Sequence, residues 1–512
     1  GADAPPCAYE DFDSSDCLLV AGANPAFAHP IAFRRIHADK AARPEMKIIV
    51  VDPRRTDTAA SADLHLAIRP GTDIWLFNAM LQVLIAEGYA NLPWITAHTE
   101  GFEALREAVL PITPAVAAEV CGVRAEDIVT AARWWGAAQA PLSLWCMGLN
   151  QSHHGTHNGT ALIALSLALG KIGQPGCGPF SLTGQPNAMG GREVGGLANL
   201  LSAHRDLANP QHRAEVAALW GVPEVPERPG LAAVEMFEAV RTGQIRALWI
   251  VCTNPAHSMP QQALIREALE TCEFVVLQEA YSTTETAAYA DLLLPATTWA
   301  EKEGAVTNSE RRITHVRPAV SPPGEARADW QIASEFARVL GAKLGRAQQA
   351  ARMFSYAEAE AVFLEHAEST RGRDLDITGL SYATLDLHGP QQWPCPQGAT
   401  RGTARLYADG VFPTASGKAR FVVPTDALTA ERCDAQYPLS LTTGRLRDQW
   451  HGMSRTGKLA RLYSHVDEPR IELHASELSA RGIATGTLVR VRSRRGAVIL
   501  RAHASAEIQP GQ

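Results

Sequence analysis

The sequence predicts an α/β protein with two pseudo-equivalent parallel-sheet domains followed by a C-terminal β-barrel. Two apolar strands separated by a tight turn and a helix occur twice along the chain, and continuous apolar strands are typical of parallel sheets covered on both faces. The segment from Tyr437 onward instead contains short alternating strands around turn residues, which favour a small barrel. At 512 residues the chain has room for roughly three domains of ~150 residues each.

The repeat begins with LLVAGANPAFAHP at 18–30 and LWIVCTNPAHSMP at 248–260. Each copy continues through a helical stretch into a second apolar strand, KIIVVDPRRT or EFVVLQEAYS, and then into an Ala-Asp-Leu strand. The interval from the turn asparagine to the later aspartate is 39 residues in the first copy, Asn24 to Asp63, and 37 residues in the second. Two matched β-α-β units indicate two similar ligand sites, or one ligand with two similar halves.

The elements of the first unit follow one another as a parallel sheet requires. A helix is expected over Ile31–Ala42, between the first two strands. The PGTD turn at Pro70–Asp73 then begins another helix, because Thr72 or Asp73 can cap it and apolar residues follow at helical spacing. Helical patterns continue to about Ala140, and PLSLWCMG is expected to form the next strand.

A glycine-rich, charge-poor stretch at Gly148–Gly196 precedes the second unit, and loops of this length inside a compact protein are usually functional or mobile. Within it, Thr160–Leu169 is expected to be a buried helix. The second β-α-β unit spans about 245–298, and a helical and irregular segment covers about 330–434. In the final segment we expect a strand at LSLTTGRL, a strand and a helix at RIELHASELSARG, and a hairpin in TLVRVRSRRGAVILRAHA that turns at Gly496.

Composition and charge exclude several classes of protein. A net charge of −7 argues against a general nucleic-acid binder, and no apolar stretch approaches the ~20 residues that span a bilayer. Nine cysteines are scattered without a CxxC pair, which favours reduced cytoplasmic thiols and excludes zinc-ribbon and iron–sulfur motifs within this stretch. No signal segment opens the sequence, and we expect both of its ends to be truncated.

The two Asn-Pro turns are the first candidate site. They follow parallel strands at the edge where open α/β sheets bind ligands, and Asp52 ends the next strand as the ribose-binding acid of a dinucleotide fold does. GANP is not GxGxxG, so a plain NAD site is a poor fit. Arg54 and Arg55 could hold a phosphate by bidentate hydrogen bonds, or they could form a solvated loop pair.

Two further motifs lie in the glycine-rich stretch. HHGTH at 153–157 invites a zinc site, but no carboxylate or cysteine stands at ligand spacing and glycine interrupts the helix that would align the rings. Arg192 is one of the few charges in this stretch, and an arginine in a neutral glycine-rich loop indicates an anion as its partner. An ion pair with Glu193 or another carboxylate is the alternative.

Eight motifs together resemble the bis-molybdopterin-guanine-dinucleotide oxidoreductases of the dimethyl sulfoxide reductase superfamily: GANPAFAHP, VDPRRTDTA, IRPGTD, MGLNQSHHGTHN, TGQPNAMGGREVGG, CTNPAHSMPQ, EKEGAVTNSERR and TTGRLRDQWHGMSRTGK. The resemblance extends over essentially the whole chain and is strongest for bacterial assimilatory nitrate reductases. NAMGGREVGG is the most specific string, because formate dehydrogenases differ there. The resemblance implies two pterin dinucleotides, one held by each half, with molybdenum between them and a barrel of the double-psi type closing over them.

The resemblance also implies roles for individual residues. One dinucleotide would be held by Gly22, Asn24, Pro25, Asp52, Arg54, Gly71 and Asp73, and the other by Thr253, Asn254, Ser258, Gln278 and Asp291. Further cofactor-binding candidates are Gly148, Gln151 and Gly155 in the glycine-rich stretch and Thr443, Gly444, Arg445, Trp450 and His451 in the barrel segment. Met147, Gln185 and Arg192 would lie near the metal. Arg192 would orient the arriving anion, and its charge would favour the oxygen as it transfers.

On the same resemblance the chain divides into four segments. We expect a first α/β dinucleotide-binding domain at 1–183, a second at 184–345, a helical and irregular connecting segment at 346–434 and a truncated cofactor-binding barrel at 435–512. The molybdenum-binding cysteine of the family and its 4Fe–4S domain are expected upstream of this chain, so no residue here is expected to bind the metal, and Cys7 is not promoted to a ligand. HGM at 451–453 departs from the usual His-Thr-Met, which removes one hydroxyl from the cofactor site.

The resemblance implies a cytoplasmic molybdenum enzyme of nitrate assimilation that reduces nitrate to nitrite by oxygen-atom transfer. Electrons would reach it from a ferredoxin or an NAD(P)H-linked flavoprotein through the 4Fe–4S cluster of the parent protein, and this segment alone would be inactive. Neither a nucleic acid nor a membrane is expected as a partner. One alternative is a formate dehydrogenase-like enzyme. Another is a cofactor-free structural scaffold, like the related subunit of respiratory complex I, although the motifs of both halves and the barrel are intact.

Overall fold

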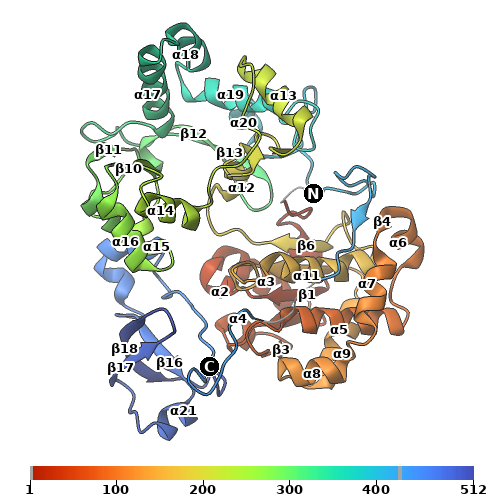
Figure 1. Cartoon of the computed structure of the whole chain (residues 1–512). Coiled ribbons are helices and arrows are strands. Elements are labelled where there is room, and N and C mark those ends of the chain that lie inside the picture. The colour runs from red at the N-terminus through yellow and green to blue at the C-terminus, as the bar shows by residue number, and fades with distance from the viewer. Residues whose placement is uncertain (1–3, 425–428) are drawn as a thin grey trace. The chain divides into compact units, whose positions relative to one another are not determined.

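The computed structural model describes residues 4–424 and 429–512, which form two units. Unit 1 comprises Gly1–Gly184, Ala404–Arg447 and Val466–Gln512, and unit 2 comprises Gln185–Thr403 and Asp448–His465. Each unit contains a parallel sheet with helices beside it, which confirms the predicted α/β class (Figure 1). Within the described ranges, no helix combines the length and the apolar character that crossing a membrane requires.

The sheet of unit 1 has five parallel strands in the order β3-β2-β1-β5-β6. The direction of winding reverses between β1 and β5, and open α/β sheets bind ligands beyond the carboxyl ends of the strands at such a switch point. Cys17 is in register with both Lys47 and Pro141, so the three central strands begin level. The strands are β1 Cys17–Ala21, β2 Lys47–Val51, β3 Leu64–Leu66, β5 Pro141–Trp145 and β6 Gly178–Ser181.

Alternate residues of these strands pack into two separate cores, one on each face of the sheet. Leu19 and Ile49 belong to the core that contains the apolar residues of α5, α9 and α11, whereas Leu18 and Ile48 belong to the core that contains Ile36 of α3. Burial on both faces explains the continuous apolar strands of the sequence. The helices of unit 1 are α1 Asp11–Ser14, α2 Pro25–Ala28, α3 Pro30–Ala42, α4 Asp57–Ala60, α5 Asp73–Ala86, α6 Leu92–His98, α7 Phe102–Val109, α8 Pro114–Cys121, α9 Ala125–Ala137, α10 Met147–Asn150 and α11 Gly155–Leu169.

The start of α11 differs from the prediction. The helix begins at Gly155 rather than at Thr160, so part of the HHGTH motif is helical. Gly155 lies so close to α10 that a Cβ atom there would come within 2.2 Å of the Asn150 carbonyl oxygen. This close approach explains why a glycine begins the helix, where the sequence pattern indicated a loop.

The parallel sheet of unit 2 has three strands in the order β11-β10-β9, and its core lies on one face. Leu248 and Ile250 of β9 are buried in that core with residues of α14 and α16. On the other face Trp249 and Val251 remain 37% and 45% exposed, and Trp249 contacts Phe336 edge-to-face at 4.8 Å between ring centroids. The elements are α14 Ala233–Arg241, β9 Ala247–Val251, α15 Pro255–Ser258, α16 Gln262–Thr271, β10 Phe274–Glu279, the 3₁₀ helix Glu285–Tyr289 and β11 Leu292–Pro295.

The rest of unit 2 surrounds an antiparallel sheet in the order β12-β13-β14. The helices that follow agree with the helical and irregular character predicted for this part of the chain. These elements are α12 Ala188–Glu193, β7 Leu200–Leu201, β8 Arg205–Asp206, α13 Pro210–Trp220, the 3₁₀ helix Trp299–Glu301, β12 Gly304–Thr307, β13 Arg312–Val316, α17 Asp329–Lys343, α18 Ala347–Met353, α19 Ala359–Ser369, α20 Tyr382–His388, β14 Gln391–Gln392 and the 3₁₀ helices His451–Met453, Thr456–Lys458 and Ala460–Tyr463.

The C-terminal part of unit 1 forms a three-stranded sheet in the order β16-β18-β17. The predicted hairpin is confirmed: β17 and β18 are antiparallel, and Ser493 N donates to Gly496 O at 2.9 Å in the turn. LSLTTGRL was expected to be a strand, and this prediction is wrong, because residues 439–446 pair with no other strand among the described residues. The elements of this part are β16 Arg470–Leu473, α21 Ala475–Ala480, β17 Leu488–Arg492 and β18 Ala497–Ala504. A separate two-stranded pair in unit 1 joins β4 Thr99–Glu100 to β15 Ala419–Arg420.

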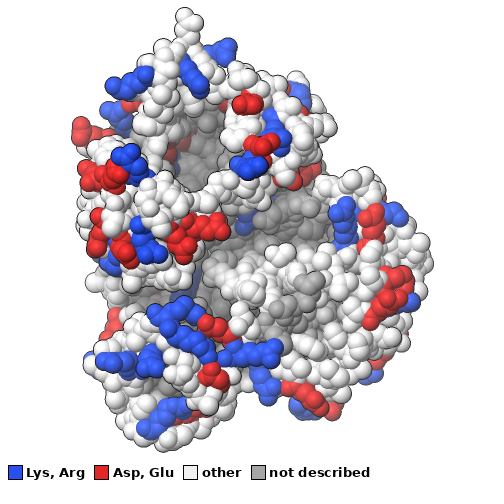
Figure 2. Space-filling model, in the orientation of Figure 1, with Lys and Arg blue, Asp and Glu red and all other residues white. Residues whose placement is uncertain are grey.

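This C-terminal sheet is basic although the chain as a whole carries a net charge of −7. Seven arginines and two glutamates lie between Arg470 and Ala504. Figure 2 shows Lys and Arg side chains gathered on this part of the surface. Several of them are neutralised locally, as by the ion pairs Arg501–Glu468 and Arg470–Glu472, so the net surface charge is lower than the arginine count indicates.

Candidate functional site

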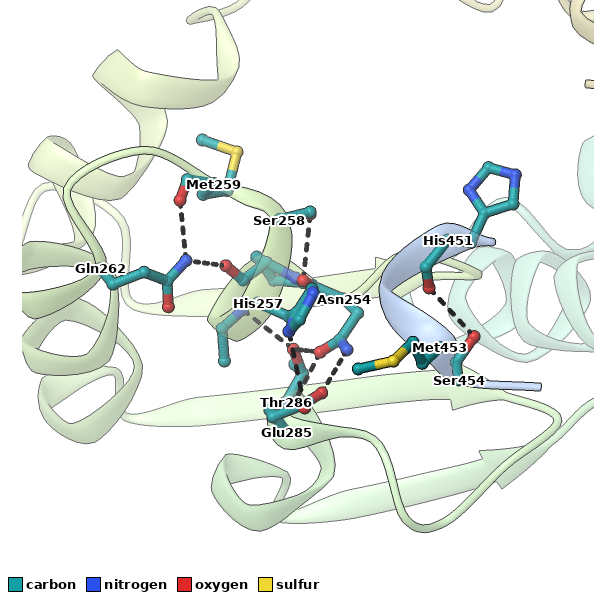
Figure 3. Close-up of polar contacts among 12 residues, drawn as sticks. Asn254, His257, Ser258, Met259, Gln262, Glu285, Thr286, His451, Met453 and Ser454 are labelled. Atoms are coloured by element: carbon teal, nitrogen blue, oxygen red, sulfur yellow. Dashed lines mark hydrogen bonds and ion pairs between the residues drawn. The ribbon is translucent and has the colours of Figure 1, made fainter. Parts of the chain in front are cut away.

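In both copies of the repeat, the turn asparagine is bound to a threonine that lies more than thirty residues later. Asn24 Oδ1 accepts a hydrogen bond from Thr58 Oγ1 at 2.6 Å, and Asn254 Oδ1 accepts one from Thr286 Oγ1 at 2.7 Å (Figure 3). Each threonine oxygen also accepts the N–H of the second residue after its asparagine, at 3.2 and 3.1 Å. The two Asn-Pro turns are therefore fixed in the same way at the carboxyl ends of β1 and β9.

A second shared contact lies at the opposite edge of each sheet. Asp63 Oδ2 accepts the Ile48 N–H at 2.7 Å, and Asp291 Oδ2 accepts the Val275 N–H at 2.7 Å. These aspartates therefore tie the amino ends of neighbouring strands together. Asp291 was expected to hold a dinucleotide; it lies at the amino edge of its sheet, and its assignment remains a prediction.

The two copies differ where the chain leaves the first strand. Gly22 and Cys252 occupy equivalent positions, and both have φ +53°. A Cβ atom at Gly22 would lie 2.6 Å from Leu149 N, and Gly148 N donates to Gly22 O at 2.8 Å. Only glycine fits in the first copy, because β5 lies next to β1 and the residues that follow β5, Gly148 and Leu149, pack against Gly22. In the second copy β9 is the last strand of its sheet, and a cysteine side chain has room.

Two half-buried carboxyl groups lie near the carboxyl edge of the first sheet. Burial raises the pKa of Asp52, which follows β2, and that of Asp73, which begins α5, each to about 6. The Arg54 N–H, which donates to Asp52 at 2.9 Å, and the Arg54 charge partly offset the shift of Asp52, whereas a backbone hydrogen bond alone offsets that of Asp73. Gly71, with φ +79°, makes the turn that precedes Asp73. Half-buried carboxyls of this kind are suited to bind neutral N–H or O–H donors.

The sequence analysis missed the counterpart of Asp52 in the second copy. Asp63 accepts from Ile48 and Asp291 accepts from Val275, so Ile48 and Val275 are equivalent. Asp52 and Glu279 each lie four residues further along the chain, and they are therefore equivalent as well. Asp52 directly follows β2, and Glu279 is the last residue of β10. Aligning TDTAASADL with TETAAYADL places Asp52 opposite Ala280, one residue after Glu279, so the sequence alone shows this correspondence only if one residue is skipped.

Arg54 and Gln278 contact other protein groups. The Arg54 guanidinium lies 3.0 Å from carboxylate oxygens of both Glu472 and Glu507 in the C-terminal segment of the same unit. Gln278 is 1% exposed and donates to Asp329 at 2.8 Å. Its Oε1 atom is buried without a hydrogen-bond partner among the described residues, and so could accept from a ligand.

Around Asn254 the second copy forms a compact polar cluster (Figure 3). Asn254 Nδ2 donates to Glu285 Oε2 at 2.6 Å, and Ser258 Oγ donates to Asn254 O at 3.0 Å. Gly452 approaches this cluster so closely that a Cβ atom there would lie 2.4 Å from the His257 ring. The ring of the neighbouring His451 points away from Asn254 in Figure 3.

The approach of Gly452 to His257 predicts the effect of restoring the threonine usual in the family. Gly452→Thr should destabilise the protein by roughly 1–3 kcal/mol, because the new side chain must displace the His257 ring and position 452 has φ +63°. Gly482→Thr is the matched control, since Gly482 has φ +64° and no atom within 4 Å of its Cβ position. Thermal unfolding of both variants measures the difference, and equal losses would show that the His257 contact is unimportant.

Asp73 predicts a pH effect on the stability of the cofactor-free protein. Its pKa is about 6 in the folded chain against an ordinary value of 3.8, so the folded state holds the proton more tightly. The stability gained from this proton is complete below about pH 4 and is lost as the pH rises through about 6. Asp73→Asn should flatten this fall, and thermal unfolding between pH 4 and 8 measures it. Parallel profiles for the two proteins would contradict the shift.

The remaining cofactor-binding candidates of unit 1 lie on turns and at helix ends. Arg445 Nη2 donates to Phe27 O of the first Asn-Pro turn at 2.9 Å, so the Thr443-Gly444-Arg445 segment is attached to that turn. Pro25 is the first residue of α2. Gly148 lies in α10, Gln151 follows it, and Gly155 begins α11. In unit 2, Thr253 is exposed beside Asn254, and Trp450 precedes His451.

The three residues predicted near the metal belong to different units. Met147, 43% exposed, begins α10 in unit 1, whereas Gln185 and Arg192 belong to unit 2. Arg192 lies in the last turn of α12 and donates to Met189 Sδ at 3.5 Å. The alternative partner, Glu193, forms hydrogen bonds with Thr307 and Trp393 instead.

No group of three His, Cys, Asp or Glu side chains in the described part of the chain has the arrangement of a metal site. Cys7 is 1% exposed, and its thiol lies 3.4 Å from the carbonyl oxygens of Cys177 and Pro179, as expected for a structural thiol. None of the nine cysteines, all of which lie within the described residues, forms a disulfide.

The carboxyl edges of the two parallel sheets fit two nucleotide-like ligands. Asp52, Asp73 and Glu279 offer acceptors for base or ribose groups, and the unsatisfied Gln278 oxygen offers another. The duplication of the Asn–Thr contact gives both edges the same turn geometry. This donor and acceptor set suits dinucleotides better than a protein-ligated metal ion.

Comparisons with known proteins agree with this geometry. The family description "Molybdopterin oxidoreductase" matches residues 5–339, and "Molydopterin dinucleotide binding domain" matches residues 439–512. A nitrate reductase of Synechocystis sp. is 44% identical and is matched over 100% of this chain and 71% of its own length. A nitrate reductase of Klebsiella oxytoca is 39% identical, and this chain, matched in full, spans 58% of it. The alpha subunit of an F420-dependent formate dehydrogenase of Methanocaldococcus jannaschii is 36% identical over 100% of this chain and 73% of its length.

Among solved structures, acetylene hydratase from Pelobacter acetylenicus has the same fold. The TM-score is 0.73 with 20% sequence identity, and the alignment covers 99% of this chain and 70% of that chain. At this identity the likeness concerns the fold alone.

Proposed function

Because the chain belongs to the molybdopterin oxidoreductase family, we propose that it carries the cofactor-binding part of a nitrate reductase. The proposed reaction is the reduction of nitrate to nitrite by oxygen-atom transfer, with molybdenum held by two molybdopterin guanine dinucleotides. The relatives named nitrate reductase, which match the full length of this chain, support the choice of substrate.

The observation that carries the proposal is the duplicated carboxyl edge. Asn24 and Asn254 are held by equivalent threonines, and each copy has an acid at the carboxyl end of its second strand. Two equivalent nucleotide sites in one polypeptide suit a cofactor that contains two dinucleotides. A single NAD or flavin nucleotide would occupy only one of the two equivalent sites.

In this proposal each copy holds one dinucleotide through its turn and its acid. Asp52, Asp73 and Glu279 accept hydrogen bonds from guanine or ribose. The residues assigned to the first dinucleotide are Gly22, Asn24, Pro25, Asp52, Gly71, Asp73, Gly148, Gln151 and Gly155, and those assigned to the second are Thr253, Asn254, Ser258, Gln278 and Glu279. Thr443, Gly444, Arg445, Trp450 and His451 are assigned to the pterins, and Arg54 is assigned to a phosphate that would compete with Glu472 and Glu507 for its guanidinium.

The residues of this chain bind and orient the reactants in the proposed reaction. When bound, the molybdenum cofactor accepts the oxygen atom of nitrate and supplies two electrons. Arg192 is assigned to the nitrate anion, whose planar oxygens suit the fork of a guanidinium. Met147 and Gln185 are assigned to the path by which nitrate arrives.

We further propose that the enzyme serves nitrate assimilation in the cytoplasm. Nine cysteines without a disulfide among the described residues agree with a reducing compartment. Electrons would come from a ferredoxin or an NAD(P)H-linked flavoprotein by way of a 4Fe–4S cluster in the complete protein.

Formate oxidation is the second candidate function, because a formate dehydrogenase subunit is 36% identical over the full chain. The test is oxidation of reduced viologen by the complete, cofactor-loaded protein with nitrate as acceptor, beside viologen reduction driven by formate. Oxidation that depends on nitrate is the expected result. Activity with formate alone would overturn the proposal and select the second candidate.

A further inference from the structure

One threonine holds both ends of α12, the short helix that carries Arg192. Thr307 N donates to Asn187 Oδ1 at 2.9 Å, at the position that caps the start of the helix. Thr307 Oγ1 donates to Glu193 Oε2 at 2.8 Å, at the last residue of the helix. Because both bonds come from the final residue of β12, α12 is held against the antiparallel sheet of unit 2.

The carboxylate of Glu193 lies deep inside unit 2. The residue is 2% exposed, and Trp393 Nε1 donates to Glu193 Oε1 at 2.6 Å, so both carboxylate oxygens are satisfied. The guanidinium of Arg311, which is 0% exposed, lies 5.3 Å from the centre of the Trp393 ring and provides a nearby positive charge. A buried carboxylate with a full set of donors is costly to disturb, because removing one donor leaves an unsatisfied buried oxygen.

Strained backbone surrounds this carboxylate. Ala203, His204 and Arg311 have φ values of +59°, +56° and +66°, which L-residues rarely adopt. Ala203 N donates to Glu193 O at 2.7 Å, and Trp393 N donates to Arg311 O at 3.1 Å. Such conformations persist only where the surrounding contacts enforce them, and they concentrate at functional sites.

Packing alone does not hold α12. A cavity of about 210 Å³ lies between α12, β12 and α19, and Asn187, Glu193 and Thr307 contribute to its wall. Van der Waals contacts are therefore missing on this side of the helix. The hydrogen bonds to Thr307 and Trp393 replace them as the interactions that set its position.

We propose that Glu193 and Thr307 are positioning residues that fix α12 so that Arg192 meets the substrate anion at the correct angle. The inference rests on the proposed role of Arg192. A guanidinium recognises a planar anion through a fixed pair of hydrogen bonds, so a small tilt of its helix weakens recognition. Displacements of about 1 Å can reduce catalysis by roughly 100-fold.

The first test compares Thr307→Val with Thr307→Ser in the molybdenum-loaded holoenzyme. Valine keeps the shape of threonine and the backbone bond to Asn187 but removes the hydroxyl, whereas serine keeps the hydroxyl. Thr307→Val should raise the KM for nitrate about tenfold. The KM of Thr307→Ser should stay within about twofold of that of the parent. An unchanged KM with fewer loaded molecules would show a purely structural role and overturn the proposal.

The second test reads the helix itself and does not depend on turnover. Amide hydrogen exchange over residues 188–196 should accelerate in Thr307→Val and in Glu193→Ala. Glu193→Gln should restore both slow exchange and nitrate affinity, because its amide can still accept from Trp393 and donate to the Thr307 hydroxyl. Unchanged exchange in Thr307→Val and Glu193→Ala would overturn the proposed support of α12.

The two arms separate this inference from the proposed function. If the parent enzyme reduces no nitrate while the exchange results hold, the support of α12 stands and the assignment of Arg192 to nitrate fails. If nitrate is reduced and both Thr307 variants match the parent in KM and in exchange, the positioning role fails and the proposed function stands.

Discussion

Arg192→Ala should lower kcat/KM for nitrate by about 100-fold or more while molybdenum and guanine contents stay near those of the parent. The expected loss follows from the role assigned to the guanidinium, since removing one preorganised group that stabilises developing charge costs about 10²–10³-fold. The cofactor should remain, because the dinucleotide residues belong to other segments of the chain. Steady-state kinetics with reduced viologen, normalised to molybdenum, measures the effect.

Arg192→Lys is the control for this experiment. Lysine keeps the positive charge but loses the planar fork, so it should recover only part of the activity. Loss of the cofactor in Arg192→Ala would contradict the assignment to substrate. Full activity in that variant would contradict it as well.

Gly22→Ala should destabilise the protein by about 3 kcal/mol or more. The new Cβ atom would lie 2.6 Å from Leu149 N and 2.8 Å from the Gly148 carbonyl carbon, and backbone atoms cannot move aside as a side chain can. The position also has φ +53°. Overpacking in a close-packed region usually costs about 1–3 kcal/mol, and a backbone clash lies at the upper end.

Cys252→Ala is the control that the repeat itself provides. It has the same φ of +53° and already carries a Cβ atom, so the substitution should change stability by less than about 1 kcal/mol. Denaturant unfolding of both variants makes the comparison. Similar losses at the two positions would show that the close approach between β1 and β5 is not the cause.

The central strands of the first sheet were predictable, because burial on both faces imposes continuous apolar runs, whereas the order of the strands and the strand β6 were not predicted. Leu18 and Leu19 point to opposite cores and are both buried, which no polar residue at either position would allow. Trp249 shows the limit of this rule. It lies in an equally apolar strand, yet it is 37% exposed because the core of the second sheet lies on one face.

Contacts between distant residues were harder to predict. The Asn24–Thr58 and Asn254–Thr286 hydrogen bonds join residues 34 and 32 positions apart, and spacing alone does not indicate which polar residue meets which. The position of Asp291 at the amino edge was hard to predict for a related reason. The Ala-Asp-Leu motif was recognised as a repeat, but which end of the strand faces a ligand depends on the strand direction within the sheet.

The local sequence pattern also gave a wrong prediction where strand formation depends on a pairing partner. Residues 439–446 have the composition of a strand, but a strand exists only if a neighbour offers its backbone, and Ser440 N instead bonds to Gly511 O in a loop. The four segment boundaries and the roles of individual site residues remain predictions. They depend on how ligand and protein meet, which sequence patterns do not specify.

The central claim is that each copy of the repeat holds one dinucleotide. The most direct measurement is the ratio of acid-released guanine nucleotide to molybdenum in the purified, complete protein. The account predicts about two guanine nucleotides for each molybdenum. A ratio of one or less would contradict it, because one of the two matched carboxyl edges would then hold no nucleotide.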